Sequence, residues 1–378
     1  MKPNDSNDRF PQLDGLRGLL AVYVAFHHLI MFCGIPFLGV AALLGRGEKA
    51  VHVFIILSGF VIFHLLHKSG MGWWTFMVRR FFRLWPLLAV AVILASFVAP
   101  LEVQVWQHGP PETAFRQERI IHFMDHPAPF LTSTLLIVHG MIPEFLLPNA
   151  HANILPPAWS IGLEWQFYLI APLCLWLARS GKTWLLVLGI LVLALGAAGG
   201  ERWKAWNDAF LPAYTGYFAI GAFCHAAWRQ MQKSMSSATL GTVAFMLATI
   251  VWSKDTALIL WSFALLSALP AGHAFDALIR PLRSLLASRW LVWIGDRSYS
   301  IYLLHWPLMM VIVWCLQDAA WAAHSKWALF AVSSLVATPV VLIASHLTYT
   351  FVELPFIQLS RKVTRRPAAI SGVEVTTA

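Results

Sequence analysis

The sequence predicts an all-α protein: a polytopic membrane bundle of about ten transmembrane helices with both chain ends in the cytoplasm. Hydrophobic residues make up 58% of the chain and charged residues only 12%, whereas a soluble domain has about 25% charged residues. Apolar runs such as 184–198 and 331–344 recur along the whole length, each close to the ~20 residues that cross a bilayer as a helix. Lysine and arginine gather in alternate loops, which orients the spans.

The predicted spans cover, in chain order, residues 14–33, 51–67, 84–100, 160–178, 184–199, 209–226, 238–252, 257–273, 291–316 and 327–351. Segment 131–147 is not counted, because it is short and is interrupted by Gly140, Pro143 and Glu144. If it crossed, every later loop would change sides and the excess of basic residues in the inner loops would vanish. We therefore expect this segment to be re-entrant or interfacial.

The spans form one expected membrane domain, residues 1–356, followed by a basic tail, 357–378, expected to be disordered. The first apolar run lacks a small-x-small cleavage site, so it is interpreted as a retained helix and not a signal peptide. The four cysteines lie far apart in or beside apolar runs, which predicts free thiols and no metal site. The net charge of +9 is explained by inner loops that face membrane lipids, so no nucleic-acid partner is expected.

The first predicted span, "LDGLRGLLAVYVAFHH", contains ionisable residues, which are costly in a membrane. Arg17 and His28 are 11 residues apart, close to three helical turns, so they share a face about 16 Å apart along the axis, and His27 points away. An anion-binding residue at the rim and a base in the middle suit a long ligand with a charged head, such as coenzyme A. The alternative, in which Arg17 reaches lipid phosphate and His28 is a core histidine, stays open on these residues alone.

Two further clusters contain candidate site residues. In "MVRRFFRLWPLL", Arg80 and Arg83 are three residues apart and share a helix face. Arginine suits bidentate phosphate contacts, although a plain orientation anchor fits equally. In "PPAWSIGLEWQFYLIAP", Ser160 is expected to cap the span and Glu164 lies one turn further in. A carboxylate at that depth needs a partner: it could orient His28, bind a sugar hydroxyl or join two helices.

Other polar residues of the spans are given supporting or structural roles. In "IGDRSYSIYLLHWPLM", Arg297 lies at the inner end and His305 just before Pro307, where it could satisfy a helix kink. Asp14, Ser160, Arg297 and His305 are predicted to support the site. Ser58 is assigned to close helix packing, and Glu353 is expected to balance an arginine at the inner rim.

Six segments, taken in order, resemble the acyltransferase 3 family of membrane O-acyltransferases. Arg17 and His28 resemble its Arg-x10-His motif, Arg80 and Arg83 its Arg-x-x-Arg motif, and Glu164 the acid of its Trp-Ser-x-x-x-Glu segment. The segments "VHVFIILSGFVIF", "GDRSYSIYLLHWPL" and "YTFVELPF" resemble further family helices. The matches run from residue 13 to 356, and the chain is expected to be the form without a C-terminal esterase-like domain. The chain departs from the family pattern at Ile55 and Ile56 in the second segment, and His27 beside His28 is an extra candidate for the base.

The resemblance implies an acyltransferase of the plasma membrane, expected to be a bacterial inner membrane. It would move an acyl group, expected to be acetyl, from cytoplasmic acyl-CoA to a sugar hydroxyl of a cell-envelope glycan or lipid-linked precursor, with acyl-CoA as co-substrate and no bound cofactor. His28 would be the general base, assisted by Glu164, and Arg17, Arg80 and Arg83 would hold the CoA phosphates. Alternatives are a proton-coupled transporter or flippase of a glycolipid or organic anion, and a non-catalytic sensor.

Overall fold

A computed structural model describes residues 9–110, 113–180, 198–233, 255–268 and 276–365, and these residues form helices, turns and loops without a β-strand. Six of the described helical segments are long and apolar enough to cross a membrane. They are Pro11–Phe32 (α1), Gly39–Ser69 (containing α2, Gly47–Ser69), Trp73–Gln107 (α3), Pro156–Leu177 (within which α6, Trp159–Arg179, begins), Ser298–Leu316 (α14) and Lys326–Val363 (α16, Lys326–Thr348, with its continuation). The protein is therefore an all-helical membrane protein.

The remaining predicted spans are shorter or fall elsewhere. Predicted spans 184–199 and 238–252 lie almost entirely outside the described residues. Span 209–226 corresponds to α9 (Thr215–Lys233), which is helical but too polar to count as a membrane span, and span 257–273 corresponds to the 12-residue α11 (Thr256–Ser267). Ten spans and cytoplasmic chain ends thus stay predictions.

One predicted boundary is wrong. The third span was expected to open near Pro86, but α3 begins at Trp73 and Pro86 lies inside it. Arg79, Arg80 and Arg83 are therefore helical residues of α3 and do not belong to a loop. At the other end of the chain, α16 passes through a π-helical turn, Tyr349–Glu353, into α17 (Leu354–Val363). The expected tail boundary at 356 consequently falls inside a helix.

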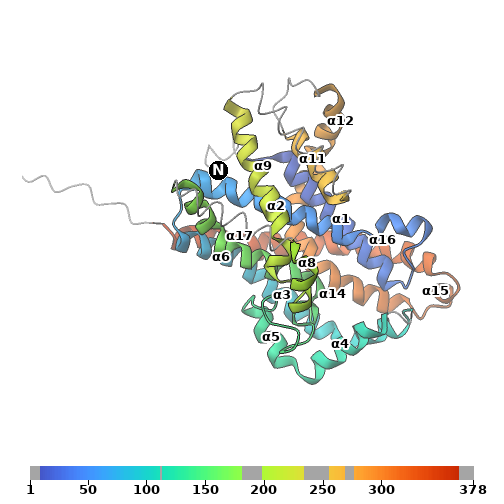
Figure 1. Ribbon diagram of the computed structural model, residues 1–378. Helices are drawn as coiled ribbons and strands as arrows, with labels where there is room; N and C mark the ends of the chain where they lie inside the picture. The colour runs from blue at the N-terminus through green and yellow to red at the C-terminus, as the bar shows by residue number, and fades with distance from the viewer. Residues whose placement is uncertain (1–8, 111–112, 181–197, 234–254, 269–275, 366–378) are drawn as a thin grey trace, which may run out of the picture.

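The bundle is built around α1, α2, α3 and α14 (Figure 1). Helix α14 packs against α1, α3 and α16, and α2 packs against α9. Helices α9, α11 and α12 (Asp276–Leu286) lie at one edge of the molecule, and α4 (Ala114–Asp125) and α5 (Pro127–Leu135) lie at the opposite edge. These four helices, together with α6, carry the candidate site residues between these edges.

Glycines bring α1 against α13 (Arg289–Asp296). A Cβ atom added at Gly18 would lie 2.7 Å from the Leu291 carbonyl oxygen and 2.8 Å from the Gly295 nitrogen, and one added at Gly15 would collide with Leu286. Small residues allow membrane helices to approach this closely. The two glycines of "LDGLRG" therefore form a packing face, and Arg17 between them points elsewhere.

The segment after α5 does not cross as a helix, as predicted. It turns at Ile137, whose φ of 58° is left-handed, and continues through turns and the short helices 150–152 and 156–158 to the start of α6. The buried Asn207 amide donates hydrogen bonds to the carbonyls of His139 (3.0 Å) and Ile142 (2.7 Å), and it thereby satisfies backbone that no helix pairs. These contacts fix the segment against Asn207, which directly follows α8 (Gly200–Trp206).

Candidate active site

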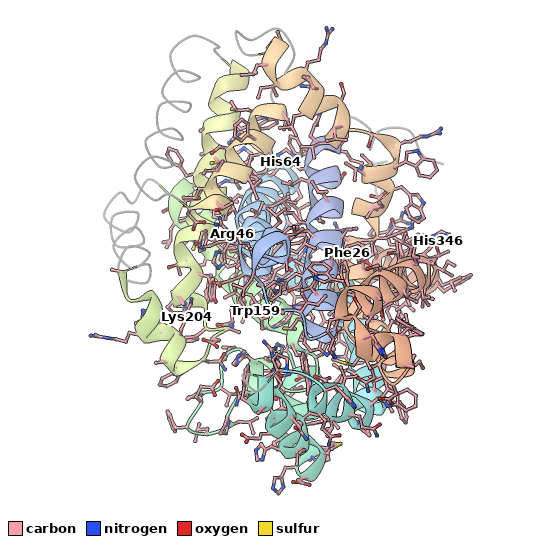
Figure 2. The ribbon with its side chains drawn as sticks, turned by 90° about the vertical axis from the view of Figure 1, so that its right-hand side faces the viewer. Phe26, Arg46, His64, Trp159, Lys204 and His346 are labelled. Carbon is pink, nitrogen blue, oxygen red and sulfur yellow. The ribbon has the colours of Figure 1, made fainter. Side chains whose placement is uncertain are left out.

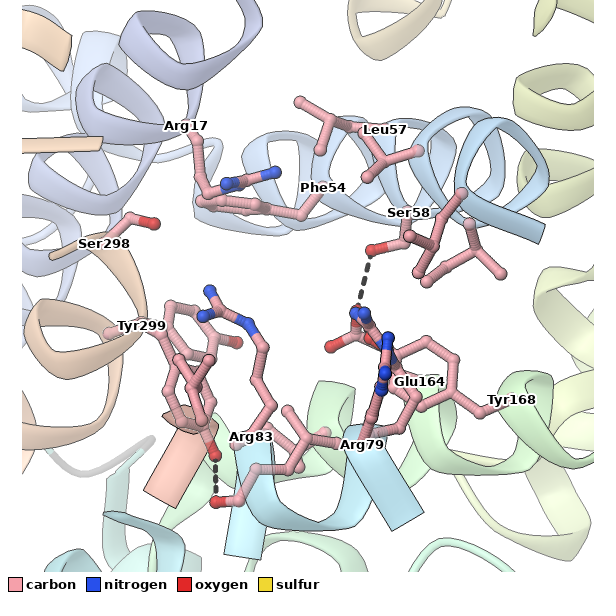
Figure 3. Close-up of a pocket in the computed structure, with 18 of the residues that line it drawn as sticks. Arg17, Phe54, Leu57, Ser58, Arg79, Arg83, Glu164, Tyr168, Ser298 and Tyr299 are labelled. Carbon is pink, nitrogen blue, oxygen red and sulfur yellow. Dashed lines mark hydrogen bonds between the residues drawn. The ribbon is translucent and has the colours of Figure 1, made fainter. Parts of the chain in front are cut away.

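One cavity of about 550 Å³ is lined by arginines from several elements, and we call it the arginine pocket. Arg17 comes from α1, Arg80 and Arg83 from α3, and Glu164 from α6; Figure 3 shows Arg17, Arg83 and Glu164 facing this common space. Its other polar lining residues are Arg9, Ser58, Arg79, Ser160, Tyr168, Ser298, Tyr299, Tyr302, Ser360 and Arg361. The structure thus brings together the three arginines that the sequence singled out.

Acidic partners hold two of these arginines. The Arg17 Nη1 lies 3.4 Å from a carboxylate oxygen of Asp14, one turn earlier on α1. The Arg83 Nη1 lies 4.0 Å from Glu353 Oε2, so the predicted pairing of Glu353 with an arginine is confirmed. Both guanidiniums stay partly exposed to the pocket, at 23% and 32%, so they have surface left for a ligand.

Glu164 organises the pocket wall on α6. Its Oε1 accepts hydrogen bonds from the Ser58 hydroxyl, at 3.0 Å, and from the Tyr168 hydroxyl (Figure 3). The Arg80 guanidinium lies over the Tyr168 ring, 5.7 Å from its centroid. Ser58 therefore lines the site and binds Glu164, so its assignment to helix packing is wrong; it is Gly59 beside it that packs against α9.

A second cavity, of about 440 Å³, contains the histidines, and we call it the histidine pocket. It is lined by His27 and His28 of α1, by Trp306 of α14 and by polar and charged residues from other segments: Glu48, Arg116, Arg119, His151, Lys204 and Asp208. Trp159 of α6 and Lys204 of α8 (Gly200–Trp206), both lining residues, lie at one level in Figure 2. His28 and Glu164 therefore line different pockets, and the expectation that Glu164 orients His28 is replaced by another partner.

That partner is His305. Its Nδ1 lies 3.0 Å from the Ile301 carbonyl oxygen, and its Nε2 lies 2.7 Å from His28 Nδ1. A carbonyl only accepts, so a neutral His305 carries its proton on Nδ1 and accepts at Nε2. His28 must then donate from Nδ1, which leaves its Nε2 lone pair unprotonated. The pair thus sets His28 in the tautomer that a general base requires.

Trp306 links this pair to a buried carboxylate. Its ring contacts the His28 ring edge-on, with centroids 5.0 Å apart, and its indole N–H donates to Glu102 Oε2 at 3.1 Å. Arg119 lies 3.6 Å from Glu102 Oε1. Burial lowers the pKa of the Arg119 guanidinium to about 10 against the opposing charge of Glu102, so Arg119 stays charged at neutral pH. Glu102 follows predicted span 84–100 directly, and its position there was the one signal in the sequence.

The other predicted site residues lie in different surroundings: some line a pocket and one does not. His27 also lines the histidine pocket, where its Nδ1 donates to the Leu44 carbonyl at 2.7 Å. Ser160 does not cap α6, because the N-cap is Ala158 without a side-chain hydrogen bond; Ser160 instead donates to the Tyr302 hydroxyl at 2.9 Å. Arg297 lines neither described pocket: its Nε donates to His346 Nδ1 at 3.0 Å, and its guanidinium lies 4.0 Å from the centroid of the Trp293 ring.

The chain is similar in sequence to several proteins named as acyltransferases or transacylases. The chain is 28% identical to the acyltransferase MdmB of Streptomyces mycarofaciens, over 96% of this chain and 94% of that protein. It is 23% identical to the peptidoglycan O-acetyltransferase OatA of Listeria monocytogenes, over 91% of this chain but only 55% of that protein. It is 27% identical to the putative membrane-bound transacylase BcsY of Komagataeibacter xylinus, over 81% of this chain and 75% of that protein.

No solved structure matches the chain. A family model described as an acyltransferase domain matches residues 10–346. That range includes Arg17, His28, Arg80, Arg83 and Glu164, and it covers most of the chain. The protein therefore belongs to this family of membrane acyltransferases.

Proposed function

We propose that the protein transfers an acyl group, in the first instance acetyl, from acyl-CoA to a sugar hydroxyl of a cell-envelope glycan or glycolipid. The observation that carries the proposal is the pair of pockets on one set of helices, one with Arg17, Arg80 and Arg83 and the other with His28. The first suits a polyanionic donor and the second suits a hydroxyl acceptor. The names of the relatives support acyl transfer, and one of those relatives, OatA, is named as a peptidoglycan O-acetyltransferase.

In the donor pocket, the three arginines bind the CoA phosphates. Arginine presents a planar fork of N–H donors that matches phosphate oxygens. Asp14 and Glu353 hold two of the guanidiniums in position, and Glu164 does so indirectly for Arg80 through Tyr168. The thioester arm then extends along the helices toward His28. Acyl-CoA is the co-substrate and would come from the cytoplasm of a bacterial cell, since the arginines lie on segments that the charge pattern places inside.

In the acceptor pocket, the acceptor oxygen attacks the thioester carbonyl while the unprotonated Nε2 of His28 takes its proton. The C–S bond then breaks, and the CoA thiolate receives the proton from His28. His305 holds the tautomer throughout, since its own Nδ1 proton is bound to the Ile301 carbonyl. General base catalysis of this kind contributes about 10²–10⁴ to the rate.

The test is acyl transfer from labelled acetyl-CoA by purified protein in proteoliposomes that contain envelope glycolipid. We expect His28→Ala to lower kcat by about 10²–10⁴ and His27→Ala, the matched neighbour in the same pocket, to lower it much less. Arg80→Ala and Arg83→Ala should mainly raise the KM for acetyl-CoA, because phosphate binding holds substrate and transition state alike.

Two results would contradict the proposal. Wild-type turnover in folded His28→Ala would show that His28 is not the base. An unchanged KM for acetyl-CoA in both arginine variants would show that these arginines do not bind the phosphates. Movement of glycolipid across the bilayer without thioester consumption would favour the transporter alternative.

A further inference from the structure

The two pockets follow one another along the same four helices. Each of the four helices contributes residues to both pockets, and the paired residues lie about one to three helical turns apart. The pairs are Arg17 and His28 on α1, Ser58 and Val51 on α2, Glu164 and Trp159 on α6, and Ser298 and Trp306 on α14. The cavities are therefore consecutive chambers of one path along the bundle, and not sites on separate faces.

Tyr302 is the one described residue that lines both chambers. It is on α14, one turn after Ser298 and one turn before Trp306, and it is only 7% exposed. Its ring centroid lies 6.0 Å from that of Phe54 on α2 and 6.1 Å from that of His305. The Tyr302 side chain thus lies at the boundary between the arginine pocket and the histidine pocket.

Among the residues that the structure describes, one hydrogen bond holds the hydroxyl end of this side chain. Ser160 Oγ donates to the Tyr302 hydroxyl at 2.9 Å, and Ser160 directly follows Trp159, a lining residue of the histidine pocket. Tyr302 therefore reaches from α14 across to the first turn of α6. One neutral hydrogen bond between hydroxyls is weak enough to break when a ligand displaces the ring.

We propose that Tyr302, positioned by Ser160, is the partition between donor and acceptor chambers and determines which acyl groups reach His28. The inference rests on the proposed function, since the acyl carbon must pass from the arginine pocket to the histidine pocket. A short acyl group passes beside the displaced ring, whereas each added methylene must find space there. Enzyme pockets discriminate about 10–200-fold per methylene.

The partition is testable without any acyl transfer. Val51→Cys, in a chain whose four native cysteines are replaced, places a thiol in the histidine pocket. A membrane-impermeant anionic methanethiosulfonate is added to sealed vesicles on the side of the arginine pocket. We expect slow labelling with Tyr302 present and several-fold faster labelling in Tyr302→Ala.

Two controls make the labelling specific. Val61→Cys lines the arginine pocket alone and should react equally with or without Tyr302. Tyr299→Ala removes a tyrosine one turn earlier on α14 that lines only the arginine pocket, so it should leave Val51→Cys protected. Equal labelling of Val51→Cys in wild-type and Tyr302→Ala backgrounds would overturn the partition.

The selectivity is tested with acetyl-CoA and butyryl-CoA. We expect Tyr302→Ala to raise the kcat/KM ratio of butyryl to acetyl by about tenfold or more. Tyr302→Phe, which keeps the ring but loses the hydrogen bond that positions it, should raise the ratio by much less than Tyr302→Ala does. An unchanged ratio in Tyr302→Ala would overturn the selectivity even if labelling accelerates. If the wild-type protein consumed no acyl-CoA, the proposed function would fail while the labelling result still decided the partition.

Discussion

The position of His28 along α1 could be predicted from the sequence, but its hydrogen-bond partner could not. The 11-residue spacing between Arg17 and His28 predicts that they lie at two different depths along α1. In the structure, Arg17 lines the arginine pocket and His28 lines the histidine pocket. The spacing could not supply the partner of His28, because His305 is 277 residues away in the chain. A pairing of that kind is set by the packing of α1 on α14 and not by any local pattern.

The tautomer of His28 should depend on His305. His305→Phe removes the acceptor for His28 Nδ1, so the His28 proton can occupy Nε2 and the base is lost part of the time. We expect kcat to fall by about 10²-fold with little change in the KM for acetyl-CoA. His305→Gln, whose amide oxygen can accept the same hydrogen bond, should recover part of the loss.

A double substitution separates positioning from structure. His28→Ala combined with His305→Phe should be no slower than His28→Ala alone, because the two residues act as one unit. Multiplicative losses in the double variant would mean that His305 acts independently of His28.

At the scale of elements, apolar runs located α1, α2, α3, α6, α14 and α16, and they placed the starts of α1, α6 and α16 within three residues, but they missed the start of α3. Helix α3 begins 11 residues before the predicted span, at Trp73 rather than at 84. Its first turns carry arginines that a hydropathy pattern assigns to a loop. They remain helical because they face a pocket and acidic partners such as Glu353. Ionisable residues within a membrane helix lower its hydropathy, so a hydropathy pattern misses that part of the helix. Because such residues are costly in a membrane, they also indicate a functional site.

The glycine face of α1 yields a prediction about an element. Gly18→Ala places a Cβ 2.7 Å from the Leu291 carbonyl oxygen, so α13 must move away from α1. Overpacking of this kind costs about 1–3 kcal/mol and should displace the neighbouring Arg17. We expect a lower unfolding temperature in detergent and a raised KM for acetyl-CoA. Gly72→Ala is the matched control, because its Cβ meets nothing within 4 Å; equal stability of the two variants would refute the packing argument.

The segment between α5 and α6 should respond to pH through His139. Burial lowers the pKa of His139 to about 4 from 6.5, against the hydrogen bond that it donates to the Ala158 carbonyl. A depressed histidine pKa means that the unfolded segment binds the proton more tightly. Stability is therefore complete above pH 6.5 and is lost as pH falls from 6.5 toward 4, by about 3 kcal/mol.

Hydrogen exchange of peptides from residues 136–158, corrected for intrinsic rates, measures this loss between pH 7 and pH 5. Protection should fall at the lower pH in the wild-type protein. His139→Gln can keep a donor for Ala158 but does not titrate, so its protection should change little over that range. Protection in wild type that is independent of pH would contradict the assignment.

For the whole molecule, the charge pattern assigns the two pockets to opposite sides of the membrane. Arg9, Arg80 and Arg361 of the arginine pocket belong to segments that the pattern assigns to the cytoplasm. Arg116 and Lys204 of the histidine pocket belong to segments that it assigns to the opposite side. The sequence assigns these sides from loop composition alone, and the sides stay predictions. It could not predict that both pockets lie on the same four helices, which depends on how distant spans pack.

This arrangement predicts that donor and acceptor approach from opposite sides of the membrane. Inside-out and right-side-out vesicles from bacteria that produce the protein are incubated with radiolabelled acetyl-CoA, which does not cross the bilayer. Label should enter envelope glycolipid in inside-out vesicles, where the arginine pocket faces the added donor, and not in sealed right-side-out vesicles. The same inside-out vesicles with His28→Ala control for other transferases. Incorporation that depends on His28 in sealed right-side-out vesicles would contradict the arrangement, because the arginine pocket would then open on the side assigned to the acceptor.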